Sequence, residues 1–536
     1  MLVAASVLFA SFVARPAFAL GPSNPSLPAP NALSATDRAA LHDSLLARFD
    51  DQNNDGGCQT GLVMDLTANW DVFTPAERAR ITGVLAPFKR DLVDPLPSTT
   101  TAGEPPPPPS GTPTSTCFSQ QGDTVLTGTH FQVQWDSGSV SQTIAQGFLD
   151  DLEFAYTAEV EQHGWKDFNG DGQYLMLAYI ENQNTGGAYT TVSQCGNFYM
   201  PYIVAGKDAV NYGTWTQEMA AHEFNHSLQF AYSYAPEFWW WEATATYVQS
   251  VVRSTYNWAD YLSGYTDYPY IAMSASSQSD QTTFLHMYGL SIFGHYLSDY
   301  QGGEAAVRET WENASRSHSA QYGLSMKDMV SGLGLDFQTI FIDFITKNVC
   351  MDYTQHSHYP SISIEGHYNN FPSSGASSSK TRPQGYGENY MRFDGGSASG
   401  DLTVNFTGDT SVDWVLVLAE TDGKNVLNSV SAVAPAGVGS VTFPGFGAND
   451  VYLVVAPLDT AETKHDYSWT ADVASDAAAD SGVLDTSTNG DSGGPHGGKH
   501  NAGQVGGCGC ANAAGGGEAG LMLAMVGLVV GRRRRR

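Results

Sequence analysis

Positive charge is scarce in this sequence. The 536 residues include 25 Lys and Arg against 55 Asp and Glu, which gives a formal net charge of −30. Proteins bind DNA and RNA largely through Lys and Arg, so this balance argues against a nucleic-acid partner. The hydrophobic fraction of 42% is ordinary for a globular protein. The length allows more than one domain, because single cores stop growing near about 250–300 residues.

Cysteine is also scarce, and no two cysteines have the CxxC spacing of a structural zinc site. Cys508 and Cys510 lie close together near the end of the sequence. The other four could form two disulfides in an exported protein, in any of three pairings; they are Cys58, Cys117, Cys195 and Cys350. We expect Cys58–Cys117 and Cys195–Cys350, because each pair then stays within one part of the chain.

The sequence has no apolar run of the roughly 20 residues that a standard membrane-spanning helix needs. A short run covers residues 2–13, and Ala17-Phe18-Ala19 follows it as an A-x-A cleavage site. Residues 1–19 therefore resemble a secretory signal peptide, although the usual positive residues at its start are missing. The alternative is a buried N-terminal helix. The signal predicts a secreted or surface-displayed protein.

The middle of the chain contains the pattern HExxH, in His222-Glu223-Phe224-Asn225-His226. Residues four apart share one face of a helix, so both imidazoles can reach the same metal ion. Glu223 lies beside them, where its carboxylate can take a proton from a metal-bound water. The pattern also recurs by chance, and the alternative is an ordinary amphipathic helix with polar residues.

A candidate third ligand, Glu242, follows sixteen residues after His226. It lies in a run rich in Ala and Thr that opens with three tryptophans, which predicts a second buried helix. A buried carboxylate needs a partner, and a zinc ion held by two histidines would supply one. Glu237, beside Pro236 in the expected turn, and a distant histidine remain alternatives.

The HExxHxxGxxH pattern of metzincins is excluded, because Gln229 and Tyr232 stand at its Gly and last His positions. Instead, HEFNHSLQFAY followed by WWWEATATY resembles the gluzincins, the thermolysin-like clan of zinc metallopeptidases. More narrowly, it resembles a group of proteins assigned as secreted metalloproteases in myxobacteria. The resemblance spans about residues 125–350 and is specific over 220–250. It implies an α+β zincin-like catalytic domain, with the HExxH helix and a helical C-terminal lobe.

The resemblance also implies the chemistry of a zinc endopeptidase acting on protein or peptide substrates. Zn²⁺ held by His222, His226 and Glu242 would polarise the scissile carbonyl and acidify a bound water. Glu223 would act as the general base and then protonate the leaving amine, without a covalent intermediate. Thermolysin's downstream Asn-Glu-x-x-Ser-Asp is absent, and Thr246 stands four residues after Glu242. A carboxylate behind a ligand histidine is therefore unassigned.

Two residues near the start of an expected apolar helix over 284–297 are further candidates. Related peptidases recruit a His or Tyr from this lobe to stabilise the oxyanion, and His286 or Tyr288 could do so here. The alternative is that both are packed core aromatics. Two other functions remain open: a non-catalytic surface adhesin built on the same scaffold, and a zinc hydrolase of amides or esters outside proteins.

One loop and one strand of the expected peptidase domain carry further predictions. Asp167, Asn169 and Asp171 form the opening of a calcium loop, but the EF-hand ending fails at Ala178, and a turn is the alternative. A strand over 197–204 precedes the HExxH helix. In related zincins such a strand lies at the sheet edge and pairs with extended substrate, but the sequence alone does not show which strand is the edge.

The expected organisation follows from changes in composition. A helical N-terminal region is either a pro-region or a structural module, and a β-sandwich accessory domain follows the peptidase domain.

The tail, with its short apolar stretch and Arg532–Arg536, resembles the MYXO-CTERM sorting tail of myxobacteria. That resemblance implies sorting machinery, transient membrane association through the tail, and Cys508 or Cys510 as the signal cysteine; a weak tail anchor is the alternative. The boundaries are 1–19 signal peptide, 20–98 N-terminal region, 99–116 Pro-rich linker, 117–380 peptidase domain, 385–475 β-sandwich, 476–507 linker and 508–536 tail.

Overall fold

The computed structural model describes residues 113–474 with short gaps, together with a few residues of the N-terminal region. The gaps are 183–186, 197, 234–235, 254, 256–257, 277–280 and 317–324, and the N-terminal residues described are 39, 42, 43, 46, 73, 74, 76 and 77. The expected signal peptide, the tail and Cys58 lie outside the described residues. The described part is an α+β structure with three sheets.

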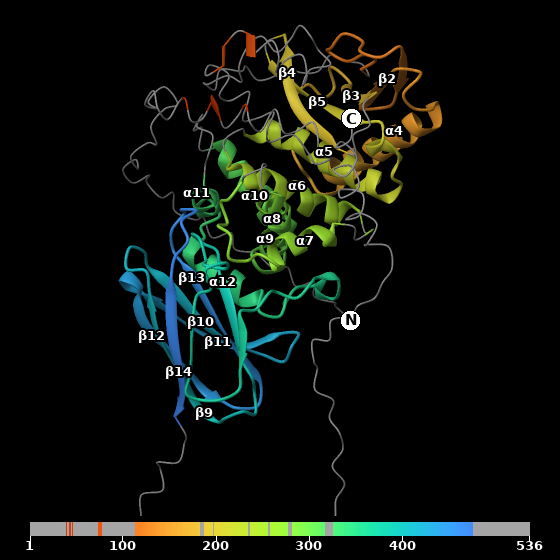
Figure 1. Ribbon diagram of the computed structural model, residues 1–536. Coiled ribbons are helices and arrows are strands. Elements are labelled where there is room, and N and C mark those ends of the chain that lie inside the picture. The colour runs from red at the N-terminus through yellow and green to blue at the C-terminus, as the bar shows by residue number, and fades with distance from the viewer. Residues whose placement is uncertain are drawn as a thin grey trace, which may run out of the picture. The chain divides into compact units, whose positions relative to one another are not determined.

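The first sheet has five strands in the order β1-β2-β3-β5-β4 (Figure 1). Strands β2, β3 and β5 are parallel to one another, whereas β1 and β4 are antiparallel to their neighbours at the two edges. The apolar runs of β3 and β5 are almost wholly buried, as is typical of strands covered on both faces. The strands are β1 Thr124–Thr127, β2 Phe131–Trp135, β3 Met176–Glu181, β4 Ala188–Cys195 and β5 Phe198–Gly206.

The strand expected just before the HExxH helix is β5, and it does not lie at the sheet edge. It pairs with β3 on one side and with β4 on the other. A turn at Gly196, where φ is 63°, folds β4 and β5 into an antiparallel hairpin. Strand β4, which comes earlier in the sequence, is the edge strand and packs on the HExxH helix.

Three long helices lie on this sheet or on each other. Helix α4, Gln142–Tyr156, begins at Ser141, whose side chain accepts a hydrogen bond from the Ile144 amide, and it runs into a π-helix, η4, at Thr157–Gln162. The HExxH helix is α5, Thr214–Tyr232, which packs on β4 and β5 and also on α4. Helix α6, Phe238–Val252, packs on α5 and buries all three of its tryptophans.

The remaining helices form a lobe that α5 and α6 join to the sheet (Figure 1). The single helix expected over 284–297 is broken at Leu290 into α8 and α9. Helices α7 and α8 approach so closely that a Cβ at Gly289 would lie 2.4 Å from the Tyr265 amide nitrogen. The lobe consists of α7 Ala259–Thr266, α8 Gln281–Gly289, α9 Ser291–Tyr300, α10 Glu304–Arg316, α11 Met326–Ser331 and α12 Phe337–Lys347.

The C-terminal part of the described chain consists of two sheets with a shared core. Their orders are β11-β10-β13-β8-β6 and β12-β9-β14-β7, and one cluster of buried apolar residues draws on both sheets. Strands β6 and β7 precede residue 385, so the sheets take chain from before the expected start of this part. The strands are β6 Gly366–Tyr368, β7 Ser373–Ala376, β8 Asn389–Phe393, β9 Gly400–Gly408, β10 Trp414–Thr421, β11 Val426–Ala434, β12 Val438–Phe446, β13 Asp450–Pro457 and β14 Tyr467–Ala474.

The expected disulfide pairing is wrong. Cys117 and Cys195 are bonded to each other, which joins the segment before β1 to the last residue of β4. Cys350 is a free, partly buried thiol. Sequence proximity favoured the other pairs, but the sheet brings two residues 78 positions apart to a Cα separation of 6.0 Å.

No helix among the described residues is long and apolar enough to cross a membrane.

A buried acid joins the helical lobe to the C-terminal sheets. Glu388, just before β8, accepts hydrogen bonds from the hydroxyls of Tyr265 on α7 and Tyr390 on β8. Asn348, at the end of α12, donates to the Tyr265 hydroxyl at 2.6 Å. Burial raises the pKa of Glu388 to about 8, against the lowering effect of the two tyrosine hydrogen bonds.

We expect Glu388→Gln to remove a pH-dependent loss of stability. The folded pKa is raised, so between about pH 4.5 and 8 the folded chain keeps a proton that the unfolded chain releases. Stability then falls as pH rises, by up to about 1.4 kcal/mol per pH unit for this group. The amide oxygen can still accept from both tyrosines. Denaturant unfolding at pH 5 and pH 8 measures the effect, with exposed Glu462→Gln as the control. Identical pH dependence in parent and Glu388→Gln would contradict it.

Candidate metal centre

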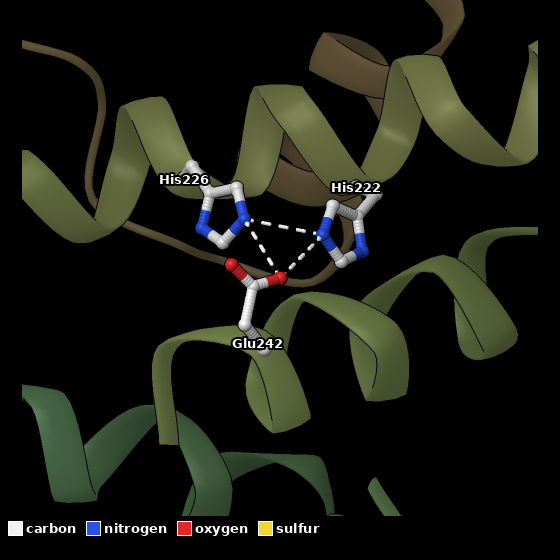
Figure 2. Close-up of side chains that lie close together, drawn as sticks. All are labelled: His222, His226 and Glu242. Atoms are coloured by element: carbon white, nitrogen blue, oxygen red, sulfur yellow. Dashed lines mark hydrogen bonds and ion pairs between the residues drawn. The ribbon is translucent and has the colours of Figure 1, made fainter. Parts of the chain in front are cut away.

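Three side chains from α5 and α6 converge on one point (Figure 2). The Nε2 atoms of His222 and His226 are 3.1 Å apart, and Glu242 Oε2 lies 3.2 Å from the first and 3.6 Å from the second. Ligand atoms about 2.0–2.1 Å from a tetrahedral zinc ion would be about 3.3 Å apart. The spacing therefore suits one small metal ion among the three.

The structure brings together the residues that the sequence singled out. Helix α5 places the two histidines one turn apart on one face, and the turn before α6 returns the chain so that Glu242 faces them. Glu237, the alternative ligand, precedes α6 and accepts a hydrogen bond from Trp239 Nε1 at 2.9 Å instead. Within the described part of the chain, this is the one group of three or more His, Cys, Asp or Glu that could hold a metal.

The charges and hydrogen bonds of the group fit a bound cation. Glu242 is fully buried, and its Oε1 has no hydrogen-bond partner among the described residues. Burial raises the pKa of Glu242, but the lowering effect of His226 and His222 is larger. The pKa of Glu242 is therefore about 2. Burial lowers the pKa of His226, whereas Glu242 and Glu223 raise it above its usual value. Two imidazoles and one carboxylate are also a common ligand set for zinc.

Glu223 is held from the edge strand of the sheet. Its side chain is buried, with 1% of its surface exposed. Thr190 of β4 shares its hydroxyl hydrogen between Glu223 Oε2 and the Glu223 carbonyl oxygen, both at 2.8 Å. Thr190 could not be identified from the sequence, because nothing in the local pattern shows which residue of β4 faces α5.

Glutamine side chains stand behind both ligand histidines. His222 Nδ1 lies 2.9 Å from Gln249 Oε1, and His226 Nδ1 lies 2.8 Å from Gln229 Oε1. From the sequence, a carboxylate was expected to contact the Nδ1 atom of a ligand histidine but was not assigned to a residue. In the structure, side-chain amides make these contacts instead. Gln229 follows His226 by three residues on α5, so helical spacing could have identified it.

Of the two candidates on α8, Tyr288 lies next to the site and His286 does not. The Tyr288 ring stacks beside the His222 ring, with centroids 5.8 Å apart and planes at 16°. The His286 ring neighbours Tyr265 instead, at 5.8 Å. Burial lowers the pKa of His286 to about 3, so it is a neutral core residue. Tyr288 is therefore the one of the two that lies beside a candidate metal ligand.

The segment expected to be a calcium loop lies between η4 and β3. Asp167 Oδ2 accepts a hydrogen bond from the Tyr156 hydroxyl at 2.7 Å. Burial raises the pKa of Asp167 to about 7, and the neighbouring Asp171 adds to the rise. The group of His, Cys, Asp or Glu side chains that could hold a metal in the described part of the chain includes neither Asp167 nor Asp171. Calcium binding by Asp167, Asn169 and Asp171 stays a prediction.

Comparison with known proteins places this site within a family. No curated protein matches the sequence. A family profile described as a family of unknown function, DUF6055, matches residues 135–478. The match covers more than half of the chain and runs from the end of β2 past the end of β14, so it includes the metal centre and both C-terminal sheets. The chain therefore belongs to the DUF6055 family.

Proposed function

We propose that this chain is a secreted or surface-displayed zinc-dependent endopeptidase with a zincin-like catalytic domain and a β-sandwich accessory domain. The observation that carries the proposal is the convergence of His222, His226 and Glu242, with Glu223 on the same helix. The fold class, the ligand set and the general base agree with the gluzincin resemblance in the sequence.

The side chains suit hydrolysis by an activated water. A zinc ion bound here would supply a Lewis acid that polarises a carbonyl oxygen and lowers the pKa of water. Glu223 removes a proton from the attacking water and delivers it to the leaving amine. Thr190 holds the Glu223 carboxylate in place. Tyr288, beside His222, is the side chain that could donate a hydrogen bond to the developing oxyanion.

The edge strand supports a peptide as the substrate. β4 is antiparallel and lies at the edge of its sheet, and Thr190 on β4 contacts Glu223. An extended peptide can add to such an edge through main-chain hydrogen bonds, which would give loose sequence specificity. This arrangement favours peptide bonds over small esters or amides.

The burial of the site favours a latent state. Glu223 and all three ligand side chains are buried, so a substrate needs neighbouring groups to move before it can enter. Phe73, from the N-terminal region, is buried in the same core cluster as α5 and α6. Phe73 therefore packs on the core of the domain, as a residue of a pro-region would. The same burial also suits the alternative function, a non-catalytic binding protein on this scaffold.

Hydrolysis of casein with and without a zinc chelator tests the proposal, with small esters assayed beside it. We expect activity on casein that the chelator removes and zinc restores. Cleavage of esters alone would favour the other class of zinc hydrolase. If the full chain is inactive, the assay is repeated after removal of residues 20–116. Zinc binding without turnover in both forms would favour the binding protein.

Export remains part of the proposal. The Cys117–Cys195 disulfide suits an oxidising compartment. The signal peptide at 1–19 and the sorting tail at 508–536, with its machinery and transient membrane association, stay predictions from the sequence.

We expect Thr190→Val to reduce turnover while zinc stays bound. Valine keeps the shape of threonine but removes the hydroxyl that holds Glu223 Oε2. A hydrogen bond to a charged group is worth about 1.5–3 kcal/mol, which corresponds to a loss in kcat of about 10- to 100-fold. The neighbouring Thr191→Val is the matched control, because adjacent strand residues face opposite sides. Equal kcat values for the two variants would show that Thr190 has no such role.

A further inference from the structure

The orientation of both glutamines behind the ligand histidines is fixed by their other contacts. Gln249 Nε2 donates to Glu218 Oε2 at 3.2 Å. Gln229 Nε2 donates to Asn225 Oδ1 at 3.0 Å and to the Trp241 carbonyl oxygen at 3.1 Å. Rotating either amide would set its oxygen against these acceptors. Each amide oxygen therefore faces its histidine.

This orientation decides which imidazole nitrogen carries the proton. An amide oxygen only accepts hydrogen bonds, so Nδ1 of His222 and of His226 must be the protonated nitrogen. Nε2 of each ring is then the nitrogen that faces the point shared with Glu242. The chain itself therefore decides that each histidine would bind a metal through Nε2.

A buried acid ends each line of hydrogen bonds behind the histidines. Behind Gln249 lies Glu218, which also accepts from the Thr255 hydroxyl. Behind Gln229 lie Asn225 and then Glu159, whose Oε2 accepts from Asn225 Nδ2 at 3.0 Å. Glu159 belongs to the π-helix η4 and is fully buried. In both lines at least one neutral amide stands between Nδ1 of the imidazole and the acid that ends the line.

We propose that Gln249 and Gln229 are the positioning residues of the metal centre. Each holds its histidine with a proton on Nδ1, and each does so as a neutral amide. Glu242 therefore remains the single negatively charged side chain among the three ligands. A carboxylate in the same place would make the histidine a stronger base and a tighter ligand. The proposal rests on zinc binding at the proposed site, but it does not depend on peptidase activity.

Zinc affinity of the full chain tests the proposal, measured by competition with a chromophoric chelator. We expect Gln249→Met and Gln229→Met each to weaken zinc binding by about 10- to 100-fold. Gln134→Met is the matched control. Gln134 is also 1% exposed, and its amide accepts from the Gln121 backbone at 2.7 Å and donates to Gln132 at 2.6 Å, away from the site. Its loss should lower stability and leave the zinc Kd unchanged.

An exchange of the amide and the acid tests the tautomer directly. The double variant Glu218→Gln/Gln249→Glu keeps the net charge, the side-chain sizes and an acceptor for the His222 Nδ1–H. We expect it to bind zinc at least as tightly as the parent chain. It also keeps the test valid if the methionine variants fail to fold, because it removes no hydrogen-bonding group.

Two results would overturn the inference. The first is a parent-like zinc Kd in Gln249→Met and Gln229→Met, or a loss no larger than that in Gln134→Met. The second is a double variant that binds zinc more than tenfold more weakly than the parent chain. A parent chain that binds zinc but cleaves no peptide would refute the proposed function and leave this inference standing. A parent chain that binds no zinc would refute both.

Discussion

Glu223→Gln should remove nearly all peptidase activity and leave bound zinc in place. Glutamine has the shape of glutamate, and its amide oxygen can still accept the hydrogen bond from Thr190. It cannot take a proton from water at neutral pH. General acid–base catalysis contributes about 10²- to 10⁴-fold, so we expect kcat/KM to fall by about 10³-fold. Casein hydrolysis and metal content, measured on the same preparation, give the two readouts.

A control for this substitution exists within the same domain. Glu161 lies in η4 and is exposed. Glu161→Gln makes the same change in charge and should leave both activity and zinc content unaltered. If Glu223→Gln keeps more than a tenth of the parent's activity, Glu223 is not the general base.

Glu242→Gln should weaken zinc binding more than any other conservative change in the chain. The carboxylate is fully buried and lies between the two imidazoles. Removing one partner of a buried charge pair costs about 3–5 kcal/mol, which corresponds to about 10²- to 10⁴-fold in affinity. Competition with a chelator of known affinity measures the change.

Glu237→Gln is the matched control for Glu242→Gln. Glu237 is the other nearby carboxylate that the sequence suggested as a ligand. In the structure it accepts a hydrogen bond from Trp239 Nε1 instead. Its loss should leave zinc affinity within about twofold of the parent, on the order of the uncertainty in such titrations. Loss of zinc from Glu237→Gln, together with retention by Glu242→Gln, would reassign the third ligand.

The local parts of the site were predictable, because helical periodicity alone aligns them. His222 and His226 share a face of α5 at a spacing that any helix produces. The tryptophan-rich run predicts a buried helix, and the structure confirms that burial. A buried carboxylate such as that of Glu242 is costly unless a cation pairs with it. The sequence thus indicated the helices and the three donors before their packing was known.

The long-range parts were not predictable, since they depend on how the strands associate. The strand order β3-β5-β4 leaves β4 at the edge, where Thr190 meets Glu223. The same order brings Cys195 to Cys117 rather than to Cys350. Gln249 lies on α6, and its contact with His222 depends on how α6 packs on α5.

The most direct test of the central claim is a titration of zinc into the metal-free chain, with casein hydrolysis measured at each step. The trimmed form that lacks residues 20–116 is titrated in parallel, in case the full chain is latent. The account predicts that activity rises with added zinc and saturates at about one ion per chain, as one three-ligand site requires. Activity that does not depend on zinc, or none in either form with one zinc bound, would contradict it.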